Sequence, residues 1–479
     1  MTAHVFRWGL LWLMLMPATA FAQPVVRRVD GSTIDTARLD TIIPRIMKQA
    51  GVIGLNIAVL NQAQPVYERV FGLRDREQHL PVTPETVFEA ASLTKPVFAY
   101  LVMSLVKDGL LKLDTPLHQY LEYKDIAHAP RHKLVTARMV LSHSSGLPSA
   151  PSGCRMEFVY SPGDYFNYSA AGVFYLQLVV EHLLKQKLEV IMNERVFGPL
   201  GMTRSSLVWT PAIEKNYATG YDYVDRKRVV KWKPDKGSAT ASLHTTAGDY
   251  GRFLQEMMTG RLLGQEHLRQ MLRPQSQVIT GDSTLLWSLG FGVDRTSNQP
   301  AYYQWGSNVG VQNFVLFYPQ QQLGLVYFTN GEHGLQIKDD LLALAVGGHY
   351  SIDKFLTYDQ YNSLTRQLTK AYDQQGLQAA LQLYAQLRQK QPVRFTNRQL
   401  DELAAHSATK GHYQDAAQIL ALNAAHYPQS WKTHVSLAEA YLKLGNRPGY
   451  TASLVEAVRH CPNPELLLGP LQQIGTKWR

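Results

Sequence analysis

Residues 90–98 read Ala-Ala-Ser-Leu-Thr-Lys-Pro-Val-Phe at the start of a helical pattern. On a helix, Ser92 and Lys95 are three positions apart and share a face. A serine hydroxyl is a poor nucleophile until a base removes its proton, and an adjacent lysine can do so when burial lowers its pKa. Ser-x-x-Lys is a weak motif by itself, because the same four-residue pattern also occurs by chance where the lysine is simply exposed on a helix.

Two further segments could complete such a site. Residues 161–170 read Ser-Pro-Gly-Asp-Tyr-Phe-Asn-Tyr-Ser-Ala, a turn followed by an apolar helix. Tyr168 in this turn could be core packing, or a phenolate base if a nearby ammonium lowers its pKa from about 10. Residues 304–310 read Gln-Trp-Gly-Ser-Asn-Val-Gly and open a strand near Val311. A strand edge bounded by glycines lets a substrate backbone approach closely and presents amide donors.

The order of these three segments resembles that of class C β-lactamases, DD-peptidases and related serine esterases, the penicillin-binding-protein-like serine hydrolases. The resemblance covers about residues 35–335 and extends to residues 141–148 (Leu-Ser-His-Ser-Ser-Gly-Leu-Pro), 196–202 and 242–250. It implies an α+β fold of two lobes, in which an all-helical lobe lies beside a five-stranded antiparallel sheet flanked by helices. The active site would lie in the cleft between the lobes, with no cofactor and no metal.

Carried over by position, the resemblance implies a role for each segment. Ser92 would be the acylated nucleophile, and Lys95 would help to deprotonate it. Tyr168 would pass protons between Ser92 and the leaving group and then activate the deacylating water. The backbone amides of Ser92 and Ser307 would form the oxyanion hole, and the substrate would bind along Gln304, Trp305 and Gly306.

Two positions depart from the family pattern. The family's Tyr-x-Asn reads Tyr168-Ser169-Ala170 here, so the amide that steadies the lysine is missing. Gln304 replaces a Lys or His that would meet a substrate carboxylate. A charge-assisted hydrogen bond contributes about 1.5–3 kcal/mol against roughly 1 for a neutral one, so substrates that need the cation should bind about tenfold worse or more. An arginine from elsewhere in the chain could compensate.

We therefore expect an acyl-enzyme hydrolase that acts on an ester, an amide or a D-amino-acid peptide, with weak β-lactam hydrolysis. The alternative is a non-catalytic penicillin-binding-like protein that binds a ligand or acts as a sensor, with its C-terminal repeats recruiting a partner. The complete set of Ser92, Lys95 and Tyr168 argues against a decayed site.

The rest of the first region supports one α+β domain, predicted over residues 23–350. Residues 54–60 and 65–71 read as a hairpin, and residues 311–317 and 323–328 read as a second strand pair. Helical patterns fill the chain from Pro96 to about Met271. Hairpins at both ends of a helical centre suggest a sheet completed by distant segments.

From residue 361 onward, Ala, Leu, Gln and Tyr recur at helical spacing. A shift of 34 residues aligns Leu403 with Leu437, Ala404 with Ala438 and Gly411 with Gly445, as well as Leu420 with Leu454 and Pro428 with Pro462. This period resembles tetratricopeptide repeats, and we predict such repeats with a capping helix over 361–479, after a linker at 351–360. A generic helical bundle is the alternative. The repeats could bind a protein partner.

The N-terminal 22 residues have the layout of a secretory signal peptide, with a charged start, a nine-residue apolar run and a small-residue stretch that suits cleavage near Ala22. We therefore expect a periplasmic or secreted protein with no membrane span after cleavage. Export would permit a disulfide between Cys154 and Cys461, although two buried thiols are the simpler expectation.

Composition excludes several other classes of protein. The chain has 479 residues, of which 45% are hydrophobic and 18% charged, unlike a largely disordered protein. The net charge of +10 permits contact with polyanions, but no nucleic-acid motif is found, and we expect no nucleic-acid partner. The basic stretch 226–233 is most simply a solvated hairpin.

Overall fold

The computed structural model describes residues 25–149, 156–222, 227–356, 358, 363–390 and 395–461. The expected signal peptide, Cys154 and the expected capping helix lie outside the described residues, so these predictions remain open.

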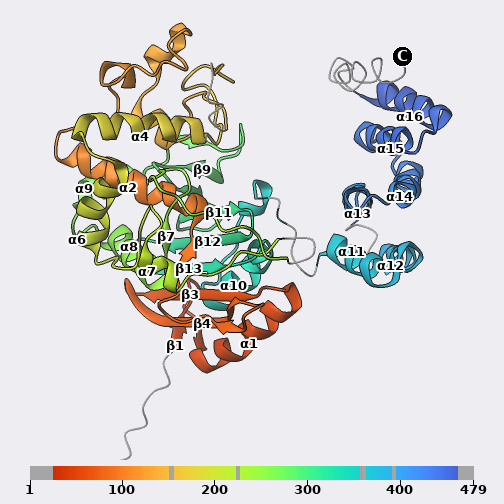
Figure 1. Cartoon of the computed structure of the whole chain (residues 1–479), viewed down its shortest axis with the longest axis horizontal. Coiled ribbons are helices and arrows are strands. Elements are labelled where there is room, and N and C mark those ends of the chain that lie inside the picture. Colours follow the sequence, from red (N-terminus) through yellow and green to blue (C-terminus); the bar gives the residue numbers. More distant parts are fainter. Residues whose placement is uncertain are drawn as a thin grey trace, which may run out of the picture.

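A large antiparallel sheet forms the centre of the first domain (Figure 1). Within the described residues its five long strands run in the order β4-β3-β13-β12-β11, and short strands extend it on both sides to nine. The expected five-stranded sheet is thus the centre of a wider one. The strands are β3 (Gly54–Asn61), β4 (Gln64–Asp75), β5 (Leu80–Pro81), β8 (Ser276–Gln277), β9 (Leu285–Trp287), β10 (Gly292–Asp294), β11 (Ala301–Asn308), β12 (Val311–Tyr318) and β13 (Leu323–Thr329).

The two predicted strand pairs meet in the middle of this sheet. Strand β13 pairs with β3 in antiparallel register, for example Val326 with Ala58. Side chains on β3 alternate between two cores: Ala58 packs with the helical lobe, whereas Ile57 and Val59 pack on the opposite face. Because both faces are covered, every residue of β3 is buried. The prediction that distant segments complete one sheet is confirmed.

Helices cover both faces of the sheet. The face that Ile57 and Val59 occupy carries α1 (Thr36–Ala50) and α10 (Lys338–Ala345). The other face carries the helical lobe, which consists of α2 (Thr94–Lys107), α3 (Ala137–Leu141), α4 (Ala170–Leu184), α5 (Leu188–Met192), a π-helical turn (Asn193–Phe197), α6 (Gly198–Leu200), α7 (Pro211–Lys215), α8 (Ala247–Thr259) and α9 (Gln265–Leu272). None of the helices in the described part of the chain is long and apolar enough to cross a membrane.

The chain continues to pack against this domain after α10. A 3₁₀ turn covers Ile352–Lys354, and both Ile352 and Leu356 are buried in the core beneath α1 and α10. Part of the stretch expected to be a linker therefore packs on the first domain.

The C-terminal region consists of helices in pairs, drawn as a separate group in Figure 1. The pairs begin at residues 364, 398 and 431, close to the predicted offset of 34. Gly376, Gly411 and Gly445 lie between the two helices of each pair with φ of 84°, 83° and 71°, a conformation that favours glycine. The helices are α11 (Leu364–Gln375), α12 (Leu377–Lys390), α13 (Arg398–Thr409), α14 (Tyr413–His426), α15 (Trp431–Lys443) and α16 (Arg447–His460).

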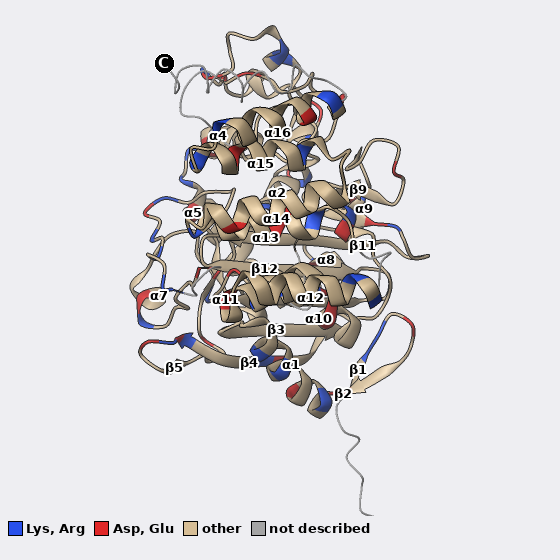
Figure 2. Ribbon diagram, turned by 90° about the vertical axis from the view of Figure 1, so that its right-hand side faces the viewer, with Lys and Arg blue, Asp and Glu red and all other residues tan. Residues whose placement is uncertain are grey.

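The matched repeat positions are buried between these helices. Leu403, Ala404, Leu437 and Ala438 are each at most 6% exposed. The described repeats build cores of their own, without residues of the first domain. The helical repeats therefore fit the structure, and their assignment as tetratricopeptide repeats stays a prediction. Figure 2 shows that Lys and Arg are interspersed with Asp and Glu along both regions.

Candidate active site

Ser92 lies where a 3₁₀ turn (η1, Ala91–Leu93) runs directly into α2. The residue before it, Ala91, has φ of 50°, a left-handed conformation that costs a non-glycine residue about 1–3 kcal/mol. The Thr94 hydroxyl donates to the Ala91 carbonyl at 2.7 Å and accepts from the Leu243 amide at 3.0 Å, which holds the turn in place. Such strain is a mark of functional turns.

Lys95 points back at Ser92, as the three-residue spacing predicts. Its Nζ lies 3.0 Å from Ser92 Oγ and donates to the Thr240 carbonyl at 2.7 Å. The residue is only 5% exposed. Burial lowers the pKa of Lys95 to about 7, so that a large share of the amine is neutral at neutral pH and can accept a proton.

Tyr168 completes the group from the turn before α4. Its hydroxyl accepts a hydrogen bond from Gln304 Nε2 at 3.0 Å, and Lys95 Nζ lies 5.1 Å from the centre of its ring. Burial raises the pKa of Tyr168 to about 12, although the polar groups of Ser92 and Gln304 oppose the shift. Tyr168 is therefore a neutral phenol at neutral pH rather than the phenolate that an adjacent ammonium could produce.

Other rings hold Tyr168 in place. The rings of Tyr168 and His143 are 4.3 Å apart, and the ring of Trp287 is 5.8 Å from Tyr168. His143 Nδ1 accepts from the Ser169 amide at 3.1 Å. Burial, helped by the charge on Lys95, lowers the pKa of His143 to about 3, so the imidazole is neutral. His143 thus contacts both the N-cap residue of α4 and the ring of Tyr168.

Strand β11 brings the third segment to Ser92. Gln304 is fully buried, and its Nε2 faces the Ser92 carbonyl at 3.4 Å as well as the Tyr168 hydroxyl. Because a carbonyl only accepts hydrogen bonds, this contact fixes which end of the amide faces the site. Gln304 thus contacts the candidate catalytic residues directly.

The edge of β11 beside Ser92 is open. Strand β10 pairs with β11 only over residues 301–303, whereas β12 continues to pair as far as Asn308. A Cβ at Gly306 would lie 2.2 Å from the Ala90 carbonyl oxygen, so only glycine allows this close approach. Trp305 and Ser307, on either side, are half-buried. The structure therefore brings Ser92, Lys95, Tyr168 and Gln304 into contact, and Trp305, Gly306 and Ser307 follow on the same strand.

The missing asparagine has a visible consequence. Ala170 is the first residue of α4, and its amide donates to the Ser149 carbonyl at 2.9 Å. Lys95 instead receives its second contact from the Thr240 carbonyl. Sequence analysis misses this contact because any residue type supplies a backbone carbonyl.

A second lysine approaches the site from the basic stretch 226–233. Lys231 has a side chain only 7% exposed and lies 2.8 Å from Glu89, which also accepts from Asn308 Nδ2 at 2.6 Å. Burial alone would raise the pKa of Glu89, but Lys231 and the hydrogen bonds outweigh it and lower that pKa. The prediction of a solvated hairpin is therefore wrong at Lys231.

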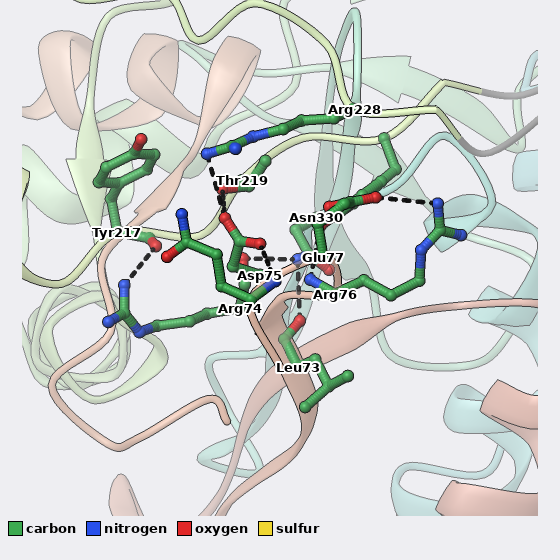
Figure 3. A network of polar contacts seen from close by, with 11 residues as sticks. Leu73, Arg74, Asp75, Arg76, Glu77, Tyr217, Thr219, Arg228 and Asn330 are labelled. Atoms are coloured by element: carbon green, nitrogen blue, oxygen red, sulfur yellow. Dashed lines mark hydrogen bonds and ion pairs between the residues drawn. The ribbon is translucent and has the colours of Figure 1, made fainter. Parts of the chain in front are cut away.

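A network of polar contacts ties the same stretch to the end of β4 (Figure 3). Arg228 lies 3.1 Å from Asp75, which also accepts from the Thr219 hydroxyl at 3.0 Å. Arg228 and Lys231 of this stretch are thus both paired with carboxylates of distant segments, Asp75 and Glu89. Because the Glu89 carboxylate neutralises it there, Lys231 does not replace the family's cation at Gln304.

Comparisons with known proteins agree with this architecture. The family model "Beta-lactamase" matches residues 39–347. The curated Protein flp of Staphylococcus aureus (strain NCTC 8325 / PS 47) is 21% identical over 314 residues, which are 61% of this chain and 62% of that protein. The match thus spans less than two thirds of that relative's length.

Solved structures of similar fold include the octameric penicillin-binding protein homologue from Pyrococcus abyssi, with a TM-score of 0.58 and 22% identity over 71% of this chain and 82% of that one. A class C beta-lactamase has a TM-score of 0.57 and 20% identity over 65% of this chain and 94% of that one. These likenesses show the fold. The family match and the fold together establish that this chain belongs to the β-lactamase family of penicillin-binding-protein-like serine hydrolases.

Proposed function

We propose that the protein is an exported serine hydrolase that works through an acyl-enzyme formed on Ser92. The observation that carries the proposal is the buried amine of Lys95, 3.0 Å from Ser92 Oγ, with its pKa lowered to about 7. A general base of this kind contributes on the order of 10²–10⁴ in rate.

Acylation would begin when neutral Lys95 takes the proton of Ser92 Oγ and the oxygen attacks the substrate carbonyl. The resulting oxyanion would be bound by the backbone amides of Ser92 and Ser307. Tyr168 would give its phenolic proton to the leaving group as the scissile bond breaks. It would then recover a proton from the Lys95 ammonium, which lies beside its ring.

Deacylation would reverse these transfers. A water molecule in the place of the leaving group would attack the acyl carbonyl. It would lose one proton to neutral Lys95 by way of the Tyr168 hydroxyl. Collapse of the tetrahedral intermediate would return Ser92 Oγ with its proton and release the acid. The same residues thus serve both half-reactions.

The substrates favoured are esters and uncharged amides, whereas D-amino-acid peptides that end in a carboxylate would bind less well and β-lactams would be turned over weakly. The support is that Gln304, a neutral donor, stands where the family carries a cation, and that Lys231 is already paired with Glu89. A substrate carboxylate would therefore gain only a neutral hydrogen bond here.

The test compares p-nitrophenyl acetate, nitrocefin and a fluorescent penicillin on the wild type and on Ser92→Ala. We expect ester turnover that is lost in Ser92→Ala, with slower turnover of nitrocefin. Faster nitrocefin than ester turnover would overturn the substrate argument. Neither turnover nor covalent labelling with any probe would favour the non-catalytic ligand-binding alternative.

Export and the role of the repeats are part of the same proposal. The signal-peptide pattern supports a periplasmic or secreted location, and the separate cores of the described repeats support an independent domain for binding a protein partner. Fractionation of cells that produce the full chain should place it outside the cytoplasm in a form shortened at the N-terminus.

A further inference from the structure

Three half-buried aromatic rings from distant parts of the chain lie together beside Tyr168. They are Phe166 from the turn before α4, Trp305 from β11 and Phe355 from the segment after α10, and we call them the aromatic rim. Trp305 lies 5.2 Å from the ring of Tyr168 and 5.5 Å from Phe355, which in turn lies 5.7 Å from Phe166. Phe355 thus links the other two members.

The rim stands on a buried aromatic base. Trp287 is fully buried, with its ring 5.2 Å from Phe166 and 6.2 Å from Trp305. His143 is 2% exposed and contacts both Phe166, at 5.9 Å, and Tyr168. Each ring of the group thus contacts at least two others, and the partly exposed rings are those of the aromatic rim and of Tyr168.

The proposed mechanism predicts that the aromatic rim lies beside the leaving group of the substrate. Tyr168 gives its proton to the leaving group, so the leaving oxygen must come within hydrogen-bonding distance of the Tyr168 hydroxyl. The substituent on that oxygen must then lie near the neighbours of Tyr168, among which is Trp305. Half-exposed rings favour an apolar group at such a position and disfavour an ion, which would lose its hydration.

We propose that the aromatic rim binds an apolar aryl or alkyl group of the leaving alcohol, and that Phe355 is a specificity-determining residue for it. The inference rests on the proposed acyl-enzyme function and names its substrate class: esters of apolar alcohols or phenols. The segment after α10 would therefore contribute to substrate specificity.

The experiment varies the leaving group while the acyl group stays constant. Phenyl acetate, ethyl acetate and 4-acetoxybenzoate are compared on the wild type, Phe355→Ala and Phe355→Leu. We expect Phe355→Ala to lower kcat/KM for phenyl acetate by about fivefold to tenfold, the effect of losing a ring contact. Ethyl acetate should change by less than about twofold, because its leaving group has less apolar surface for the rim to bury.

Two further comparisons test whether Phe355→Ala weakens binding of the leaving group or distorts the catalytic site. All three esters give the same acetyl-enzyme, so its hydrolysis rate should be equal in the wild type and in Phe355→Ala. Phe355→Leu keeps apolar volume and should recover part of the loss. In the wild type, 4-acetoxybenzoate should react more slowly than phenyl acetate, although its phenol is the better leaving group.

The outcomes distinguish the two proposals. If no ester is turned over in a Ser92-dependent way by the wild type, the proposed function fails, and this inference fails with it. Three results would overturn only the inference, provided that turnover depends on Ser92. Phe355→Ala could lower kcat/KM equally for all three esters, it could slow hydrolysis of the acetyl-enzyme, or it could raise kcat/KM for phenyl acetate.

Discussion

Two nearly buried lysines contact the short stretch from Glu89 to Ser92, and their surroundings differ in one respect. Lys95 contacts a hydroxyl and a carbonyl, neither of which carries a charge. Lys231 contacts the carboxylate of Glu89. Burial removes water from both amines, but only Lys231 has a counter-ion to replace it.

The difference shows how one residue type acquires two roles. Burial lowers the pKa of both lysines, but the charge of Glu89 opposes this shift at Lys231, whereas at Lys95 burial acts unopposed. The partner of each lysine, rather than its depth, therefore distinguishes the proposed general base, Lys95, from the paired Lys231.

The largest expected effect follows from removing the base. Lys95→Met should lower kcat/KM for p-nitrophenyl acetate by about 10²–10⁴-fold, because nothing then accepts the proton of Ser92. Stability should change by less than about 1 kcal/mol, since an apolar side chain of similar length replaces an amine without a counter-ion. Steady-state kinetics and urea unfolding measure the two quantities. Unchanged turnover would remove Lys95 from the mechanism.

The opposite pattern is expected for the second lysine. Lys231→Met leaves the Glu89 carboxylate buried beside Asn308 without its cation and should cost about 3–5 kcal/mol of stability, measured by urea unfolding. Glu89→Gln in the same chain should recover much of the loss. A variant that is as stable as the wild type would mean that the pair contributes no stability.

The pH dependence distinguishes the same two environments. Lys95 must be neutral to act, and its pKa is lowered to about 7, so kcat/KM for an uncharged ester should be level above pH 8. It should fall about tenfold per unit as the pH drops well below 7, because the protonated form then dominates. A profile that stays flat down to pH 5 would contradict the assignment.

The smallest effect concerns the neutral donor at the strand. Gln304→Lys should raise the rate at which a fluorescent penicillin labels Ser92 by about tenfold, the difference between a charge-assisted and a neutral hydrogen bond. Gln304→Met, which lacks a donor, is the matched control and should label no faster than the wild type. Equal labelling by all three proteins would show that residue 304 does not meet the carboxylate.

The sequence was enough to predict the parts of the site that depend on local spacing. Ser92 and Lys95 meet because three residues form most of a helical turn, and the hairpins at both ends of the domain follow from strand patterns and turns. Tyr168 and the Gln304–Ser307 strand could be placed beside them only through the resemblance to a family.

The remainder depends on contacts between residues far apart in the chain. Glu89 and Lys231 are separated by 142 positions, and Lys95 and the Thr240 carbonyl by 145. A basic stretch looks solvated until its partner is known. Phe355 lies in a segment with the composition of a linker, and its role follows only from its contact with Trp305.

Gly306 limits how far strand β11 can move toward Ser92 when a ligand binds. Since the strand already touches the Ala90 carbonyl at a position where no side chain fits, it has no room to move closer to the nucleophile. The spacing between the two amides proposed for the oxyanion is thus set before any ester arrives, and little reorganisation remains to be done during the reaction. Adding a single methyl group at this position would push the strand outward and widen that spacing.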